Sequence, residues 1–452
     1  MEGSDKIKVA VIGAGLTGLT TAFYLKKAGI AFKIFEKNNR AGGVIKTHHE
    51  NGFTYESGPN SGMLSKPEVP ELLEELENDC TLEPADDIAK ARWIWKNGKW
   101  HPLPSGMVSG VTTPLFSFYD KFRILGEPFR KKGDNPNESL AGLVLRRMGK
   151  SFLDYAIDPF ILGIYSGDPS KLVTKYAFPK LYNLEQNYGS FIGGAMKKAR
   201  EPKTERDKKA TKNIFSVEGG LSKFIDALVK NIEEENIQLN CSHIKVEKSD
   251  NSFVVNGEKF THVISATGGY ALKNLLPFID DAKLSVIDKM KYSRVVQVAL
   301  GFKNWEGLPL NAFGGLVPSV EKRRILGVLF LSSFLKNKAP EKGALLSVFL
   351  GGTRRPEMVE LSDEEIRQVI KEEVSEMMQL KTFDPDLLKI FRYNYAIPQY
   401  GFESEEKMKA IAELEAENPG LILAGNVRDG IGIADRINQG RMIAKQIAGE
   451  TS

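Results

Sequence analysis

Cysteine and histidine are scarce in this chain of 452 residues. The two cysteines, Cys80 and Cys241, are too few for a disulfide framework and too far apart for a CxxC site, so we expect a reducing compartment. None of the five histidines has acidic or cysteine neighbours at the spacing of a metal site, and we expect no bound metal. No nucleophile motif supports hydrolysis through a covalent intermediate.

Long apolar runs and a strong charge bias are also lacking. The net charge of +4 is too small at this length to indicate a nucleic-acid partner, and it is compatible with an acidic ligand such as a polycarboxylate. No stretch approaches the ~20 apolar residues of a membrane-spanning helix, and no secretory or transit peptide is visible before the first predicted strand. We therefore expect a cytoplasmic protein of two or three domains.

The first forty residues carry the clearest motif. An apolar strand runs into Gly13, Gly15 and Gly18, and residues 19–27 continue with helical spacing. In such a β-α-β unit the first glycine allows a tight turn, the second lets the backbone approach a pyrophosphate, and the third lets the helix pack closely on the strand. Glu36 closes the next strand, where a carboxylate can accept hydrogen bonds from a ribose diol. This arrangement predicts a bound dinucleotide.

Two further features indicate FAD. Arg40, Gly42 and Gly43 follow the acidic residue, and in flavoproteins with two dinucleotide folds this pattern places an arginine and bare backbone against the diphosphate. Near the other end of the chain, residues 421–447 have the pattern of a strand, a glycine turn and a helix. The N-terminal dipole of that helix is suited to the negative charge of a reduced flavin. We predict non-covalent FAD held by both parts of the chain.

Between these parts the sequence changes character several times. Residues 106–200 are mainly helical in pattern, and residues 197–212 form a mixed-charge run that we expect to be a solvated loop. Residues 243–269 read as a meander that returns to the cofactor domain. We predict an α/β plus α+β protein, with a discontinuous Rossmann-like FAD-binding domain (1–90, 213–280 and 413–452), an antiparallel-sheet substrate domain (91–105 and 281–412) and a mainly helical cap domain (106–212).

The helical part contains Phe116, Phe122 and Phe129 among basic residues. This mixture is compatible with a segment that lies on a membrane surface. A helical cap that covers a substrate cavity has the same pattern, and the sequence leaves both interpretations open.

Over nearly its full length the chain resembles the protoporphyrinogen and coproporphyrinogen oxidases of the flavin monoamine oxidase superfamily. Beyond the cofactor motifs, the resemblance rests on residues 58–61 (Gly-Pro-Asn-Ser), 160–169 (Phe-Ile-Leu-Gly-Ile-Tyr-Ser-Gly-Asp-Pro), 178–190 and 313–318 (Phe-Gly-Gly-Leu-Val-Pro). It implies an FAD- and oxygen-dependent enzyme of haem biosynthesis. The implied reaction is the six-electron oxidation of protoporphyrinogen IX to protoporphyrin IX, or of coproporphyrinogen III to coproporphyrin III, with hydrogen peroxide as by-product.

The resemblance also implies roles for individual residues. Asn60 and the backbone of Gly167 match positions that face the reacting centre. Lys66 falls where relatives place a basic side chain for a substrate propionate, with an ordinary surface lysine as the alternative. Four apolar side chains match those that hold the tetrapyrrole over the flavin: Phe313, Leu316, Leu329 and Phe349. The predicted cofactor residues are Gly13, Ala14, Gly15, Leu16, Thr17, Gly18, Glu36, Lys37, Arg40, Gly42, Gly43, Gly58, Pro59, Asn60, Val246, Ala266, Thr267, Gly425, Asn426, Gly432 and Ile433.

The implied partners are a porphyrinogen, dioxygen and a neighbouring enzyme of the haem pathway. The chain is expected as a monomer or a homodimer, and attachment to the inner face of the cytoplasmic membrane is compatible with the sequence. Three alternatives stay open: an amine oxidase, a carotenoid desaturase, and a non-catalytic flavin- or porphyrin-binding protein. Amine oxidases commonly keep a lysine near the flavin where this chain has Gln297, and those with a covalent flavin use cysteine or histidine, neither of which occurs after His262.

Overall fold

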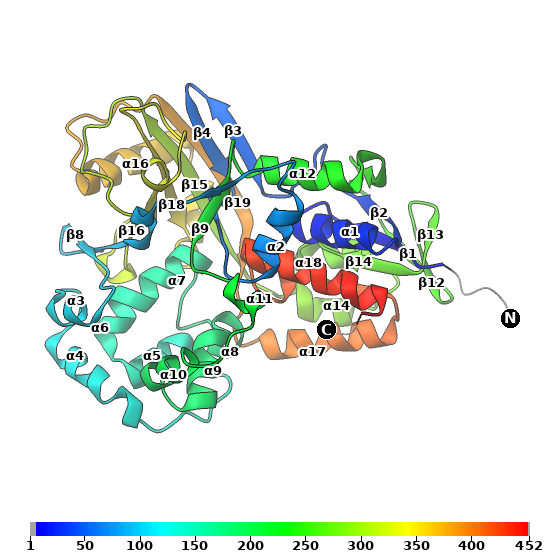
Figure 1. The fold of residues 1–452 in the computed structure, drawn as a ribbon, viewed down its shortest axis with the longest axis horizontal. Coiled ribbons are helices and arrows are strands. Elements are labelled where there is room, and N and C mark those ends of the chain that lie inside the picture. The colour runs from blue at the N-terminus through cyan, green and yellow to red at the C-terminus, as the bar shows by residue number, and fades with distance from the viewer. Residues whose placement is uncertain (1–5, 451–452) are drawn as a thin grey trace.

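Two large β-sheets and a helical region make up the molecule in the computed structural model, which describes residues 6–450. In Figure 1 the parallel sheet and its helices lie on the right, the antiparallel sheet lies at the upper left, and the helical region lies at the lower left. The two sheets and the separate helical region confirm the predicted fold class. The predicted domain boundaries stay predictions.

The parallel sheet joins segments that lie far apart in the sequence. Its five strands have the order β10 (Ile237–Gln238), β2 (Ala31–Phe35), β1 (Lys8–Ile12), β14 (His262–Ser265) and β20 (Leu421–Leu423). All neighbouring strands are parallel. The central strands are mostly apolar, as expected for a sheet whose two faces are both covered, here by helices and a small sheet. The N-terminal motif and the C-terminal segment therefore belong to one sheet.

One face of this sheet is covered by α1 (Leu16–Lys27), α12 (Ser222–Ile232) and α18 (Ile433–Ala448), with α2 (Glu68–Glu75) beside them. A Cβ atom on Gly440 of α18 would lie 2.8 Å from the Thr17 carbonyl oxygen of α1, so glycine is needed for this close approach. The other face packs against a three-stranded sheet and further helices: β11 (Val246–Ser249), β12 (Ser252–Val255), β13 (Glu258–Phe260), α13 (Leu272–Leu275), α14 (Asp281–Asp288) and α17 (Ser404–Glu417).

The second sheet has seven strands, and only the β16–β7 pair is parallel. Their order is β19 (Leu387–Pro398), β15 (Tyr292–Phe302), β18 (Ala344–Gly351), β17 (Ile325–Phe330), β16 (Gly314–Leu316), β7 (Trp93–Lys96) and β8 (Lys99–Pro102). Helix α16 (Asp363–Met378) packs on one face and buries the apolar core of this half of the molecule. Shorter elements connect the two sheets: β3 (Lys46–Glu50), β4 (Phe53–Ser57), β5 (Gly62–Met63), β6 (Leu82–Pro84), β9 (Ile214–Val217) and α15 (Leu331–Phe334).

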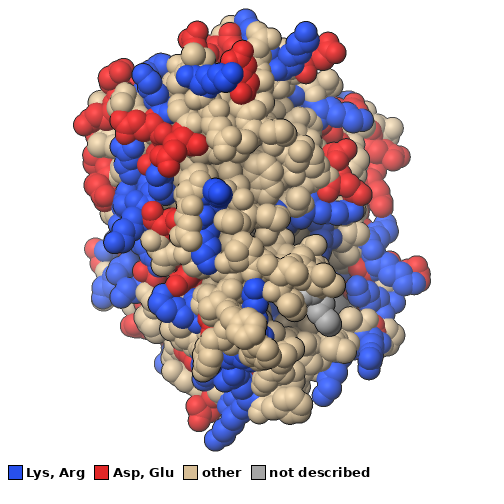
Figure 2. All heavy atoms as spheres, turned by 90° about the vertical axis from the view of Figure 1, so that its left-hand side faces the viewer, with Lys and Arg blue, Asp and Glu red and all other residues tan. Residues whose placement is uncertain are grey.

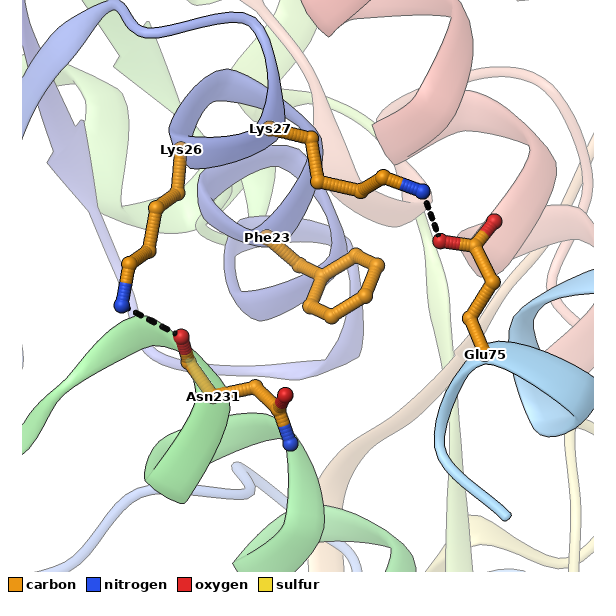
Figure 3. Close-up of a pocket in the computed structure, with 5 residues that line it drawn as sticks. All are labelled: Phe23, Lys26, Lys27, Glu75 and Asn231. Carbon is orange, nitrogen blue, oxygen red and sulfur yellow. Dashed lines mark hydrogen bonds and ion pairs between the residues drawn. The ribbon is translucent and has the colours of Figure 1, made fainter. Parts of the chain in front are cut away.

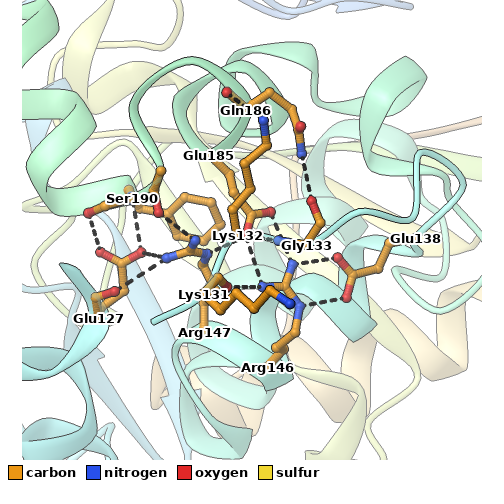
Figure 4. Close-up of polar contacts among 12 residues, drawn as sticks. Glu127, Lys131, Lys132, Gly133, Glu138, Arg146, Arg147, Glu185, Gln186 and Ser190 are labelled. Carbon is orange, nitrogen blue, oxygen red and sulfur yellow. Dashed lines mark hydrogen bonds and ion pairs between the residues drawn. The ribbon is translucent and has the colours of Figure 1, made fainter. Parts of the chain in front are cut away.

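The helical region contains α3 (Met107–Thr112), α4 (Phe118–Leu125), α5 (Leu140–Arg147), α6 (Lys150–Phe152), α7 (Asp158–Tyr165), α8 (Thr174–Ala177), α9 (Pro179–Tyr188) and α10 (Phe191–Lys198). Its centre is a buried ion-pair network (Figure 4). The Arg147 guanidinium lies 2.6 Å from carboxylate oxygens of both Glu127 and Glu185 and donates to the Gly189 carbonyl. Since a buried charge is tolerated only when it is paired, this network fixes the relative positions of α5, α9 and α10.

The mixed-charge run of residues 197–212, which we predicted to be a solvated loop, is exposed to solvent over nearly all of its length. It contains α11 (Glu205–Lys208), and Arg206 of this helix forms ion pairs with Glu68 and Glu71 of α2. The charges of the run are therefore partly used in tertiary contacts. Among the described residues, no helix has both the length and the apolar character needed to cross a bilayer.

Candidate functional site

A cavity of about 760 Å³ lies where the two sheets and the helical region meet. Its walls come from the start of α1, the turn between β4 and β5, helix α7, strands β15 to β19, and the turn before α18. This volume falls within the range of small-molecule and cofactor sites. Strands with apolar side chains supply most of one side, and glycine-rich turns supply the other.

Thirteen predicted cofactor residues line this cavity. They are Gly15, Leu16, Thr17, Gly42, Gly58, Pro59, Asn60, Ala266, Thr267, Gly425, Asn426, Gly432 and Ile433. They come from five separate stretches of sequence, which supports the prediction that both parts of the chain contribute to one site.

The remaining glycines of the N-terminal motif shape the cavity from behind. A Cβ atom on Gly18 would lie 2.0 Å from the Gly13 carbonyl oxygen, so no other residue fits there. Gly13 itself has a φ of 106°, in the region that favours glycine. Neither residue lines the cavity, and both hold the turn that brings Gly15 to it.

Glu36 and Arg40 also organise the turns around the cavity. The buried Glu36 carboxylate accepts hydrogen bonds from the backbone N–H groups of Ala14 and Asn38, at 2.8 and 2.9 Å. The Arg40 guanidinium donates to the carbonyl oxygens of Gly43 and Ile45, at 2.7 and 2.9 Å. Their predicted contacts with the cofactor itself stay predictions, as do those of Ala14, Gly43, Lys37 and the buried core residue Val246.

The residues present fit a dinucleotide. Gly15 is the N-cap residue of α1 and has an extended backbone. No side chain accepts a hydrogen bond from the first N–H groups of the helix, and a Cβ atom on Gly15 would meet no other atom within 4 Å. An uncapped helix N-terminus next to bare backbone suits a diphosphate. On the opposite wall, the buried Asn426 Oδ1 has no hydrogen-bond partner among the described residues.

The N-terminus of α18 is more complex than we predicted. The Asp435 Oδ2 atom accepts hydrogen bonds from the N–H groups of Ile431 and Gly432, at 3.2 and 3.1 Å. The other carboxylate oxygen, Oδ1, lies 3.0 Å from Lys66 Nζ. The positive end of this helix therefore already has an acidic cap, and Lys66 compensates the charge of that cap.

Four of the five predicted substrate residues line the cavity, and Lys66 does not. Phe313, Leu316, Leu329 and Phe349 all line it. Asn60 also lines it and is 6% exposed. Gly167 does not, although its neighbour Ser166 does, in a left-handed conformation with a φ of 47°. Gln399 stabilises this turn by donating to the Tyr165 carbonyl oxygen at 2.9 Å.

Arg92 is the cavity residue that the sequence did not reveal. Its guanidinium carbon lies 5.3 Å from the centre of the Phe313 ring, and burial lowers its pKa. No described acidic residue forms an ion pair with it, whereas Lys66 is paired with Asp435 and does not line the cavity. A half-buried cation without an acidic partner among the described residues points to an anionic group of a ligand.

A second depression lies on the surface between α1, α2 and α12 (Figure 3). Its two lysines are already engaged, because Lys27 pairs with Glu75 and Lys26 donates to the Asn231 carbonyl oxygen. Only Phe23 adds apolar surface. This depression offers neither free charge nor enclosure, so the cavity between the sheets is the candidate site.

Comparison with known proteins decides the family. The sequence model described as flavin containing amine oxidoreductase matches residues 16–448. This chain belongs to that family. Membership establishes a flavin cofactor and an oxidoreductase, in agreement with the shape of the cavity.

Several relatives that match over nearly the full length are named as porphyrinogen oxidases. The chain is 30% identical to protoporphyrinogen oxidase 2 of Arabidopsis thaliana, with 96% of this chain and 92% of the relative covered. It is 27% identical to the coproporphyrinogen III oxidase of Bacillus subtilis, with 96% and 97% covered. These matches confirm the resemblance to the protoporphyrinogen and coproporphyrinogen oxidases.

Solved structures agree on the fold. A crystal structure of a provisionally named protoporphyrinogen oxidase from Exiguobacterium sp. 255-15 superposes with a TM-score of 0.81 at 23% identity, over 99% of this chain and 100% of the other. Reduced UDP-galactopyranose mutase superposes with a TM-score of 0.73 at 18% identity, over 98% and 96%. At these identities the comparison establishes the fold, and the reaction has to be argued from the cavity.

Proposed function

We propose that this protein binds FAD non-covalently and oxidises a porphyrinogen with dioxygen as the final electron acceptor. The observation that carries the proposal is Arg92, which lines a cavity with largely apolar walls and has no acidic ion-pair partner among the described residues. A porphyrinogen combines a large apolar macrocycle with carboxylate side chains, and such a cavity complements both parts. The relatives named as porphyrinogen oxidases support a porphyrinogen as the substrate.

The residues divide the work between binding and orientation. The apolar group of Phe313, Leu316, Leu329 and Phe349 holds the macrocycle and excludes water, while Arg92 binds a propionate. When bound, the flavin would supply a two-electron acceptor, with dioxygen as the final oxidant and hydrogen peroxide as the by-product. Because the substrate is electron-rich, positioning contributes more than a strong acid or base. Three rounds convert a porphyrinogen to the aromatic porphyrin.

Of the rival activities, amine oxidation has the least support in the cavity. Gln297, which takes the place of the lysine common in amine oxidases, is buried and uses its amide in four hydrogen bonds to neighbouring groups. A cationic amine in the cavity would also be repelled by the positive charge of Arg92, which has no acidic partner among the described residues. Both features favour an anionic substrate.

The test is anaerobic mixing of the purified yellow protein with protoporphyrinogen IX or coproporphyrinogen III while the flavin absorbance near 450 nm is followed. We expect bleaching by a porphyrinogen and none by benzylamine or polyamines. Absence of bleaching by either porphyrinogen would contradict the proposal. The faster of the two substrates identifies the natural one.

We further propose that the protein works at the inner face of the cytoplasmic membrane. Figure 2 views the side of the molecule where α3 and α4 lie, and uncharged side chains cover much of it, with Lys and Arg among them. Phe118, Phe122 and Phe129 are 77%, 57% and 90% exposed. Residues 118–132 contain two acidic residues, Asp120 and Glu127, and both are buried.

This docking face, defined as the exposed side of residues 108–132, therefore presents aromatic rings and cations with no exposed carboxylate in residues 118–132. An apolar surface with basic neighbours fits an anionic bilayer, where rings enter the headgroup region and cations meet lipid phosphates. The rings lie on the outside of the helical region, which favours this interpretation over a cap whose apolar side chains turn toward the cavity.

A further inference from the structure

The side chain of Gln297 joins strand β15 to the segment that carries Gly58 and Asn60. It lies on β15, lines the cavity and is only 2% exposed. Its Oε1 atom accepts a hydrogen bond from the backbone N–H of Gly58 at 2.9 Å. Its Nε2 atom faces three acceptors: the Glu56 carbonyl oxygen at 3.1 Å, Ser347 Oγ at 3.2 Å and Asn60 Oδ1 at 3.5 Å.

These contacts fix the orientation of two amides. The N–H of Gly58 can only donate, so the Gln297 oxygen must face it and the Gln297 NH2 group must face Asn60. The Asn60 oxygen then turns toward Gln297, because the opposite orientation would place two NH2 groups against each other. The Nδ2 atom of Asn60 is left without an acceptor among the described residues. Because Asn60 itself lines the cavity, this NH2 group is available to a ligand.

We infer that Gln297 is a positioning residue that makes Asn60 present a hydrogen-bond donor to the bound tetrapyrrole. The inference rests on the proposed function and adds a residue to it. Gln297 acts through Asn60, while the turn at Gly58, with a φ of 114°, carries Asn60 into the cavity.

The chemistry of the tetrapyrrole gives this orientation a purpose. Every ring nitrogen of a porphyrinogen carries hydrogen and is a donor, whereas oxidation leaves ring nitrogens that carry none and are acceptors. A donor on Asn60 therefore interacts more favourably with the macrocycle as it becomes oxidised than with the starting porphyrinogen. Interactions that strengthen along the reaction raise the rate and leave substrate affinity nearly unchanged.

The first test is stopped-flow reduction of the flavin by porphyrinogen under anaerobic conditions, with Gln297→Met. This change keeps the volume of the side chain and removes both polar groups. We expect the limiting rate constant to fall about tenfold, with the substrate concentration at half-maximal rate changed less than threefold. An unchanged rate constant would overturn the inference.

A double-mutant cycle separates positioning from general damage. In an Asn60→Ala background, Gln297→Met should cause less than a twofold further loss, because the group through which it acts is gone. A full additional loss in that background would show that Gln297 acts independently of Asn60 and would also overturn the inference.

The matched control is Val298→Ala, the next residue on β15, whose side chain packs in the core on the opposite face. It should lower Tm and leave the rate constant within twofold. Should Gln297→Met fail to fold, Asn60→Asp tests the donor itself, since it keeps the size of the side chain while it replaces the Nδ2 donor by a carboxylate oxygen that can only accept. A wild-type rate in Asn60→Asp would contradict the inference.

If the unchanged protein is bleached by dithionite but by no porphyrinogen, the proposed function itself is overturned, and the inference with it.

Discussion

Arg92 and Lys66 are both basic, yet their surroundings give them different tasks. Lys66 is paired with Asp435, and Arg92 faces the cavity without a carboxylate partner among the described residues. We expect Arg92→Ala to raise the KM for a porphyrinogen by about 10- to 100-fold, because a hydrogen bond to a charged group contributes about 1.5–3 kcal/mol. The rate of porphyrin fluorescence at varied substrate concentration measures this effect.

Lys66→Ala is the matched comparison for Arg92→Ala. It should change KM less than threefold for protoporphyrinogen IX. Equal effects of the two substitutions would mean that both cations bind the substrate. A larger effect of Lys66→Ala with coproporphyrinogen III than with protoporphyrinogen IX would assign Lys66 to one of the additional propionates of the former.

Lys407 is a buried cation with no acidic partner at ion-pair distance among the described residues. Its Nζ atom lies 3.1 Å from Met290 Sδ and 4.6 Å from the centre of the Tyr400 ring. Burial lowers its pKa from 10.5 to about 8. Below pH 8 the lysine is charged in the folded protein, and its burial lowers the free energy of unfolding by about 3 kcal/mol. Between pH 8 and 10.5 the folded protein has lost this proton while the unfolded chain still binds it, so the free energy of unfolding rises with pH.

Lys407→Met should consequently raise the free energy of unfolding at pH 7, by about 2–3 kcal/mol, and much less at pH 10. Urea unfolding at the two pH values measures this difference. Lys409→Met, at a position 76% exposed on the same helix, should change stability by less than about 0.5 kcal/mol at either pH. Equal stabilisation by Lys407→Met at both pH values would attribute the effect to packing alone.

Helix α4 and the residues around it make a prediction for the docking face. We expect the flavoprotein to cosediment with vesicles that contain phosphatidylglycerol and to bind vesicles of phosphatidylcholine much more weakly. Replacing Phe118, Phe122 and Phe129 by serine should abolish binding while Tm stays within about 2 °C, because all three rings are exposed.

Exchange of exposed Ile192 and Met196 of α10 for serine is the control, because it removes exposed apolar surface from another helix. This variant should bind anionic vesicles as well as the unchanged protein. Loss of binding in the control alone would place the docking face elsewhere on the helical region.

The same elements show what a sequence can and cannot reveal. The glycine motif was predictable because its requirement is local: the carbonyl of Gly13 excludes any side chain at position 18. The choice between a membrane face and a cavity cap at residues 106–129 was not, since both need apolar and basic residues in the same proportions. Only exposure, which depends on what packs against α4, separates the two.

Arg92 was missed for a related reason. What distinguishes it is the lack of a nearby carboxylate, a property of tertiary structure that no local pattern records. The acidic cap of α18 was likewise hidden, because the contacts of Asp435 with the N–H groups of Ile431 and Gly432 and with Lys66 depend on the folded turn. In both cases the missing information concerned which charges become neighbours.

At the scale of the whole molecule, the two sheets and the helical region meet around one cavity. The cavity has walls from both sheets and from the helical region. Removal of the flavin should therefore lower Tm by several degrees, since a ligand present at 1,000 times its Kd contributes about 4 kcal/mol. Differential scanning calorimetry after removal and reconstitution measures this change.

The same experiment tests the identity of the flavin. FAD should restore Tm fully, and FMN, which lacks the adenosine half, should restore little of it. Equal recovery with FMN would contradict a dinucleotide site that extends to the N-terminal glycine motif.

The position of β20 at the edge of the parallel sheet has a consequence for synthesis on the ribosome. The neighbouring strand β14 is complete once residue 265 has emerged, but its free edge pairs only with residues 421–423, more than 150 residues later. Until then an apolar strand edge lies open to other chains, which is a route to aggregation. The turn at Gly425 and the start of α18 follow directly, so the nascent chain closes its vulnerable sheet edge and completes the flavin site in nearly the same step.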